Sequence, residues 1–246
     1  MTKSVKADQA GGAIPIVALD VSSAEAALAL ARSLRGSCTF FKVGSELFTA
    51  AGPDVVRAIR GELGADVFLD LKFHDIPNTV AGAVRSAAGL GARLLTVHAS
   101  GGSAMLTAAA EAAGSACGIL AVTALTSLDG AGLAESWGRS DVPDVQGEVL
   151  RLAALAAGAQ LHGIVCSGAE AAAVRERFGD RLAMLVPGIR LAGGAVHDQR
   201  RVMTPSAAQA AGARYLILGR AVTGAADPAG AMAQVLEELR TVGSAR

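Results

Sequence analysis

Residues 68–79 read FLDLKFHDIPNT and join the end of an apolar run to a short charged segment. The run from Val67 to Leu71 is typical of a strand buried in a parallel sheet. Pro77 can open a helix, because its missing N–H would be unpaired in the first turn anyway. The stretch therefore predicts a strand followed by a helix, which is the unit from which parallel α/β folds are built.

Three charged residues, Asp70, Lys72 and Asp75, lie at the C-terminal end of this predicted strand. Positions 70 and 72 point to the same side of an extended chain. Two carboxylates and an ammonium are costly to remove from water unless they pair with one another. One interpretation is a buried salt bridge that fixes a loop, and the other is a catalytic group of charges.

Apolar runs alternate with Ala- and Leu-rich stretches along the whole chain, as in repeated β-α units. The predicted strands are 14–19, 39–43, 67–71, 94–97, 118–124, 163–165, 183–186 and 215–218. The predicted helices are 23–34, 46–50, 53–60, 77–88, 102–113, 145–157, 168–177, 204–211 and 228–240. This pattern predicts an α/β protein with one closed (β/α)8 TIM barrel. An open doubly wound sheet is the alternative, although no G-x-G-x-x-G follows the first strand.

The composition and the start of the chain narrow the possible partners and locations. We expect one domain over residues 1–246, with 1–12 as a flexible N-terminal extension. The 22 basic and 22 acidic residues balance, so bulk charge gives no reason to expect nucleic acid or a membrane as partner. The start has no apolar signal region, and no apolar run reaches the roughly 18 residues of a membrane span. The expected location is the cytoplasm, where Cys38, Cys117 and Cys166 would be reduced, buried small hydrophobes.

Polar side chains recur where the predicted strands end, which is where (β/α)8 barrels carry their chemistry. These residues are Asp20, Lys42, Asp70, Lys72, Asp75, His98, Thr126, Ser127, Ser167, Arg190 and Arg220. Their convergence on one face predicts a site. The histidines lack an H-x-x-x-H or similar ligand spacing, so we predict no metal. Trp137 is expected to be a packing anchor in an irregular segment after the fifth strand.

The segment 70–79 resembles the signature D-x-K-x-x-D-I-P-N-T of the orotidine 5'-phosphate decarboxylase family, without a gap. Other blocks that look like the family's, in the family's order, are 19–20, 41–44, 125–127, 186–190, 198–201 and 218–220. The resemblance implies a homodimeric barrel that converts orotidine 5'-phosphate to uridine 5'-phosphate and CO2, the last step of pyrimidine nucleotide synthesis. It also implies that no cofactor is required and that Asp75 reaches into the site of the partner subunit.

The same resemblance assigns roles to individual residues. Lys72, within an array with Asp70 and Asp75, would stabilise and protonate a carbanion at C6 of the pyrimidine. The implied substrate-binding residues are Asp20, Lys42, Asp70, Thr79, Thr126, Ser127, Pro187, Arg190, Gln199, Gly219 and Arg220. Arg190 is a weaker candidate, because an arginine at the start of a loop is usually solvated. Asp20 could instead cap the helix predicted to start near Ser23.

Two other functions stay open at this point. The D-x-K-x-x-D core also occurs in barrel enzymes that act on sugar phosphates with Mg²⁺, although the Ile-Pro-Asn-Thr extension does not. A non-catalytic barrel that binds a nucleotide, with Lys72 in a structural role, is the second alternative. Chelation by EDTA separates the first alternative from a metal-free decarboxylase, and replacement of Lys72 separates the second.

Overall fold

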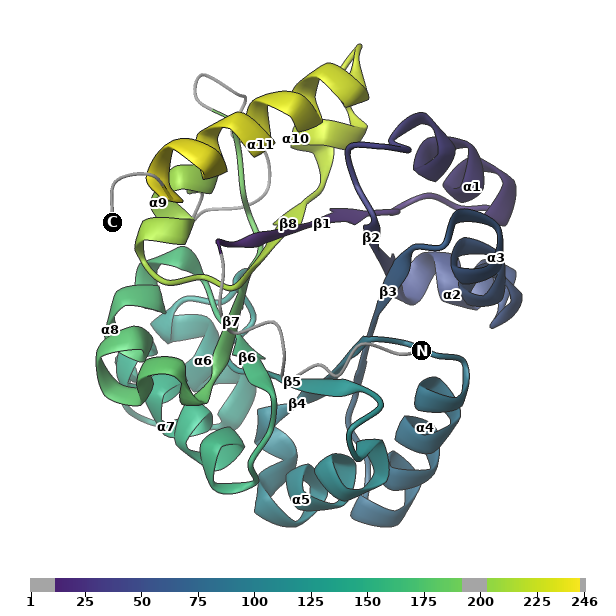
Figure 1. Cartoon of the computed structure of the whole chain (residues 1–246). Coiled ribbons are helices and arrows are strands. Elements are labelled where there is room, and N and C mark those ends of the chain that lie inside the picture. The colour runs from purple at the N-terminus through teal and green to yellow at the C-terminus, as the bar shows by residue number, and fades with distance from the viewer. Residues whose placement is uncertain (1–11, 192–202, 244–246) are drawn as a thin grey trace.

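The computed structural model describes residues 12–191 and 203–243, and in this part of the chain all the strands form one closed parallel barrel (Figure 1). Neighbouring strands in the sequence are neighbours in the barrel, and β1 closes it by pairing with β8. The strands are β1 Ile14–Ala18, β2 Phe40–Gly44, β3 Asp66–Phe73, β4 Leu94–His98, β5 Gly118–Val122, β6 Gly163–Val165, β7 Ala183–Val186 and β8 Tyr215–Leu218. The predicted (β/α)8 barrel is confirmed, and the open-sheet alternative is wrong.

Helices surround the barrel on its outer side (Figure 1). They are α1 Ala24–Ser33, α2 Ser45–Ala51, α3 Asp54–Leu63, α4 Pro77–Gly89, α5 Gly102–Ala113, α6 Gly130–Trp137, α7 Val145–Gly158, α8 Gly168–Phe178, α9 Pro205–Ala210, α10 Arg220–Thr223 and α11 Pro228–Gly243. Short 3₁₀ turns occur at Ala99–Gly101 and Gly179–Arg181. No helix within the described ranges has the length and apolar character needed to cross a bilayer.

Two helices, α6 and α10, are absent from the sequence-based prediction. In α6, the side chain of Asp129 caps the first turn by accepting a hydrogen bond from the N–H of Gly132. Trp137 is the last residue of this helix, so the expectation that it lies in an irregular segment was wrong, and the residue is 38% exposed. The three cysteines are buried as predicted, and burial raises the pKa of Cys117 and Cys166 to about 12.

Alternation along the strands separates the interior of the barrel from the layer between strands and helices. One buried cluster fills the interior and comprises Ile16, Ala18, Phe40, Phe68, Leu94, Leu120, Ala183, Leu185, Tyr215 and Ile217. Residues such as Val17, Phe41 and Leu69 belong instead to the larger cluster that includes buried helix side chains. The period of two therefore places residues 20, 42, 70 and 96 on the inner side, nearer the C-terminal ends of the strands.

A polar layer lies at the N-terminal ends of the strands. Arg93 pairs with Asp66, and its guanidinium lies 5.3 Å from the centre of the Phe40 ring. Nε2 of His162 lies 2.9 Å from the hydroxyl of Tyr215, which is fully buried. These contacts pack aromatic and charged groups together at the end of the barrel opposite the predicted site.

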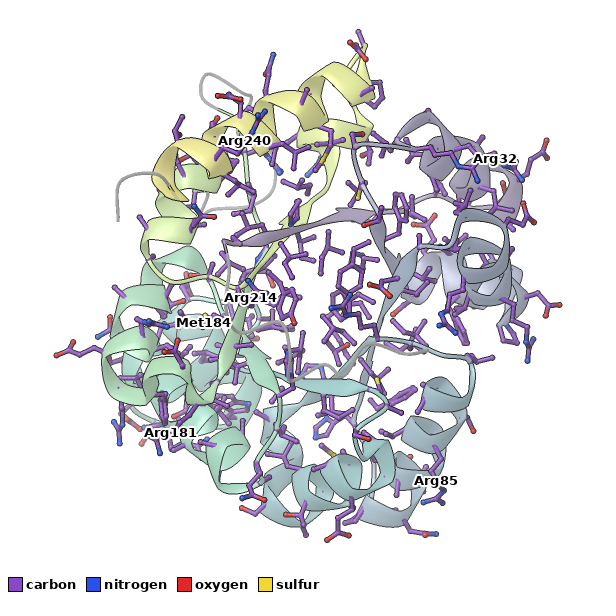
Figure 2. The ribbon with its side chains drawn as sticks, in the orientation of Figure 1. Arg32, Arg85, Arg181, Met184, Arg214 and Arg240 are labelled. Atoms are coloured by element: carbon purple, nitrogen blue, oxygen red, sulfur yellow. The ribbon has the colours of Figure 1, made fainter. Side chains whose placement is uncertain are left out.

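Arginines occupy contrasting positions in the fold. Arg32, Arg85, Arg181 and Arg240 lie on the outer elements, whereas Arg214 directly precedes β8 (Figure 2). Arg214 donates a hydrogen bond to the carbonyl of Gly12, where the described part of the chain begins. The extension expected for residues 1–12 lies, except for Gly12, outside the described residues.

Candidate active site

A continuous chain of opposite charges lies at the C-terminal mouth of the barrel. Lys42 Nζ lies 2.6 Å from Asp20 Oδ1 and 3.9 Å from Asp70 Oδ2. Lys72 Nζ lies 2.8 Å from the same Asp70 Oδ2. The side chains of Asp70 and Lys42 are 14% and 11% exposed, whereas Lys72 and Asp20 are 37% and 59% exposed. Lys72 is therefore the ammonium of the array that opens toward the mouth.

The strand sequence explains why these groups meet. Asp20, Lys42 and Asp70 each come two positions after an interior residue of β1, β2 or β3, so alternation turns their side chains to the inner side. Parallel strands end at the same edge of the barrel, which brings the three side chains together. Gly44 makes room for the pair next to it: a Cβ at this position would lie 2.9 Å from Lys42 Nζ. Asp20 does not cap a helix, because Ser23 is the N-cap of α1, so that alternative is wrong.

The backbone at Lys72 departs from a regular strand. Its φ is +50°, in the left-handed region that non-glycine residues rarely adopt. The pairing of β3 with β4 also shifts between Leu69 and Phe73. Thr96, on β4, accepts a hydrogen bond from the N–H of Lys72 and donates one to Asp70 Oδ1, each at 2.9 Å. A single hydroxyl thus joins the backbone of one site residue to the carboxylate of the other.

Two imidazoles lie beside the array. The rings of His74 and His98 are 5.4 Å apart. Burial lowers the pKa of His98, and the charges of His74 and Lys72 add to this effect while Asp70 opposes it. In residues 12–191 and 203–243 no group of three or more His, Cys, Asp or Glu side chains could hold a metal ion. The absence of a metal stays a prediction.

Asp75 does not join the array within the described part of this chain. It is exposed on the segment between β3 and α4, and its Oδ1 accepts a hydrogen bond from the N–H of Ile76 at 2.6 Å. The Ile76 side chain is 67% exposed. Thr79, another predicted contact, is exposed in the first turn of α4. The structure therefore presents residues 75–79 at the surface of the chain.

The loop after β5 carries the residues predicted to bind the pyrimidine. Thr126 is half-buried and Ser127 is exposed, between β5 and α6. Their neighbour Leu125 is 40% exposed, although it is apolar. The hydroxyls of this loop thus follow a strand whose C-terminal end lies at the same mouth of the barrel as the charged array.

The predicted phosphate-binding residues follow β7 and β8. Pro187 and Arg190 come after β7, while Gly219 and Arg220 come after β8, at the start of α10. The two ends of the loop after β7 are joined, because Ile189 pairs with Met203 in a parallel bridge. Gln199 lies outside the described residues.

Arg190 is buried, with 8% of its surface exposed, so the expectation that it is solvated was wrong. Burial lowers the pKa of its guanidinium, and the positive charge of Arg220 acts in the same direction. Its Nη1 donates to the carbonyl of Ile189. Two guanidiniums that repel each other at neighbouring strand ends are suited to a bound anion, which would relieve the repulsion.

Sequence reasoning did not identify Thr96 as a site residue. A detectable signal was present, since Thr96 is the one hydroxyl residue in the strand LLTVH and shares the inward face of Leu94 and His98. What the sequence did not reveal is the altered register of β3 and β4, which brings its hydroxyl to both Asp70 and Lys72.

The fold and the mouth together define a class of protein: a (β/α)8 barrel with a lysine–carboxylate site at the C-terminal ends of its strands. Comparison with known proteins narrows this class. The profile described as "Orotidine 5'-phosphate decarboxylase / HUMPS family" matches residues 14–235. This chain belongs to that family, which confirms the resemblance seen in the sequence.

Individual relatives are similar to this chain over nearly its whole length. The orotidine 5'-phosphate decarboxylase of Halorhodospira halophila is 52% identical over 231 residues, covering 93% of this chain and 96% of that protein. That of Nitratidesulfovibrio vulgaris strain DP4 is 47% identical over 239 residues, covering 92% and 97%. The crystal structure of orotidine 5'-phosphate decarboxylase from Lactobacillus acidophilus is similar with a TM-score of 0.80 and 36% identity, covering 93% of this chain and 99% of that chain.

Proposed function

We propose that this protein is a carboxy-lyase that converts orotidine 5'-phosphate to uridine 5'-phosphate and CO2. The observation that carries the proposal is the pairing of Lys72 Nζ with Asp70 at 2.8 Å, at the mouth of a barrel of this family. The names of the relatives support the same reaction. In metabolism this step would complete the synthesis of uridine 5'-phosphate.

The chemistry requires a cation and a proton at C6 of the pyrimidine. Breaking the bond between C6 and the carboxylate releases CO2 and leaves the electron pair on C6. The Lys72 ammonium would stabilise this charge and then transfer a proton from Nζ to C6, which completes uridine 5'-phosphate. The step involves no net oxidation or reduction, so it needs no redox cofactor, and in this proposal the Lys72 ammonium takes the place of an electron sink.

Asp70 has two roles in this proposal. It pairs with both Lys42 and Lys72, which fixes the two ammonium groups relative to each other. Its position beside Lys72 would also bring it close to the carboxylate that the substrate loses. The low exposure of Asp70 favours strong electrostatic effects, because little water screens it.

The remaining predicted residues would hold the substrate around C6. Asp20 and Lys42 would bind the ribose hydroxyls, and Thr126 with Ser127 would bind the imide edge of the pyrimidine. Thr79 would contact the ribose or the phosphate side. The proposed phosphate-binding residues are Pro187, Arg190, Gln199, Gly219 and Arg220. The buried Arg190 near the charge of Arg220 supports an anion at this place.

Asp75 would act in the site of a partner subunit in a homodimer. Its exposure beside the apolar Ile76 supports a contact surface at this segment. Mixing the inactive variants Lys72→Ala and Asp75→Asn tests this, since one site of a mixed dimer would keep both native residues. Recovery of activity would support action between subunits, whereas a mixture as inactive as its parts would refute it.

The second candidate is a Mg²⁺-dependent enzyme for a sugar phosphate, which the shared D-x-K-x-x-D core keeps open. The test follows the ultraviolet absorbance of orotidine 5'-phosphate with purified protein in EDTA. The proposal expects conversion to the spectrum of uridine 5'-phosphate. If the folded protein leaves orotidine 5'-phosphate unchanged but acts on a pentulose or hexulose phosphate with Mg²⁺, the second candidate replaces the first.

A further inference from the structure

We propose that Thr96 is a positioning residue of the reaction, which fixes the proton donor and its carboxylate through one hydroxyl. This inference rests on the proposed function, because it takes Lys72 and Asp70 as the reacting pair. Thr96 lies in the middle of β4 and its side chain is fully buried. It is not among the residues expected to touch the substrate.

The hydrogen bonds of Thr96 have fixed directions. A hydroxyl has one proton to donate and lone pairs to accept with. The N–H of Lys72 can only donate, so Thr96 Oγ1 accepts there, and it donates its proton to Asp70 Oδ1, each at 2.9 Å. The ionised carboxylate of Asp70 is a suitable acceptor for this proton.

This arrangement orients the Asp70 carboxylate. Oδ1 is engaged by Thr96, so Oδ2 is left to face Lys72 Nζ at 2.8 Å and Lys42 Nζ at 3.9 Å. Without the hydroxyl, rotation of the carboxylate would no longer be opposed from β4. The ammonium of Lys72 would then have several accessible positions in place of one.

The same hydroxyl supports an unusual backbone. Leu69 pairs with Leu95 and Phe73 with Val97, so three residues of β3 lie opposite the single Thr96. Lys72, at the end of this bulge, has a φ of +50°. A non-glycine residue is strained in this region, and such a conformation persists only where neighbouring contacts hold it. Thr96 supplies such a contact, because its hydroxyl accepts a hydrogen bond from the N–H of Lys72.

Loss of this support should affect turnover more than binding. The proposed contacts to phosphate, ribose and pyrimidine come from other residues, whereas the position of the Lys72 ammonium relative to C6 decides the chemical step. A misplacement of about 1 Å at a reacting group can reduce the rate by about 10²-fold. The expected signature is therefore a lower kcat with KM nearly unchanged.

The experiment compares Thr96→Val, which has nearly the same shape but no hydroxyl, with Thr96→Ser, which restores the hydroxyl. For Thr96→Val we expect kcat to fall by about 10²-fold, with KM for orotidine 5'-phosphate and Kd for uridine 5'-phosphate within about threefold of wild type. Thr96→Ser should recover kcat to within about tenfold of wild type. Thr96→Cys, a weaker donor of similar size, should lie between the two and serves if the valine variant does not fold.

The matched control is Thr123→Val. Thr123 directly follows β5 and is also buried, and its hydroxyl donates to the carbonyl of Val165 at 2.7 Å rather than to the array. Its kcat should stay within about threefold of wild type. The inference is overturned if folded Thr96→Val or Thr96→Cys keeps wild-type kcat, if only KM rises, or if Thr123→Val loses as much turnover. An inactive wild-type protein would instead overturn the proposed function, and the inference with it.

Discussion

Mild acid should destabilise the folded protein through His162, at the N-terminal end of the barrel. Nε2 of His162 lies 2.9 Å from the hydroxyl of the fully buried Tyr215. Burial lowers the pKa of His162 from 6.5 to about 4, and the charges of Arg214 and Arg93 add to the effect. The folded state therefore holds this histidine neutral, at a place where an additional positive charge would be surrounded by apolar and cationic groups.

The sign and the size of the effect follow from proton linkage. Between about pH 6.5 and pH 4 the unfolded chain binds a proton at His162 that the folded protein does not bind, so the free energy of unfolding falls as the pH falls. Each pKa unit corresponds to about 1.4 kcal/mol. The loss reaches about 3 kcal/mol near pH 4, and about 1 kcal/mol is already lost near pH 5.5.

The assay is chemical denaturation of the wild type and of His162→Gln at several values from about pH 7.5 to about pH 5. Glutamine can keep a hydrogen bond to Tyr215 but does not titrate. All other ionisable groups are common to both proteins, so the difference between the two stability curves isolates His162. We expect the wild type to lose about 1 kcal/mol more than the variant by about pH 5.5. Parallel curves over this range would refute the reasoning.

Three further outcomes follow from other parts of the structure. Gly44→Ala should reduce kcat/KM by about tenfold or more with little change in Tm, because the new Cβ would lie 2.9 Å from Lys42 Nζ and displace it. A variant with the kcat/KM of the wild type would count against the role of Lys42. Gly163→Ala should lower the free energy of unfolding by about 2 kcal/mol or more in urea titrations, since the new Cβ would lie only 1.9 Å from the carbonyl oxygen of Ala183. An unchanged urea midpoint would contradict this. A substrate that lacks the phosphate should lose turnover as well as affinity, and equal turnover at saturation would argue against a catalytic use of phosphate binding.

The sequence was sufficient for the fold because two local signals agree. Each strand is a short apolar run, and each run is followed by a stretch with helical composition, which the closed barrel confirms. The missed helix α6 has an understandable cause, since Gly130 and Gly132 are poor helix formers and the cap at Asp129 resembles an ordinary turn.

The site was predicted less completely than the fold. The positions of Asp20, Lys42 and Asp70 near the ends of predicted barrel strands were enough to expect them on one face, where the structure brings them together. The left-handed backbone of Lys72 depends on pairing with β4, and no local pattern specifies it. The burial of Arg190 likewise depends on tertiary packing around the end of β7, so its position at the start of a loop was misleading.

The central claim is that the Lys72 ammonium supplies the proton at C6. The most direct measurement is kcat of Lys72→Ala on orotidine 5'-phosphate, together with Kd for uridine 5'-phosphate to show that the mouth of the barrel remains intact. The account predicts that turnover falls by about 10⁴-fold or more while the variant stays folded and still binds the product. Turnover within about tenfold of wild type in a folded variant would contradict the account and leave Lys72 as a structural partner of Asp70.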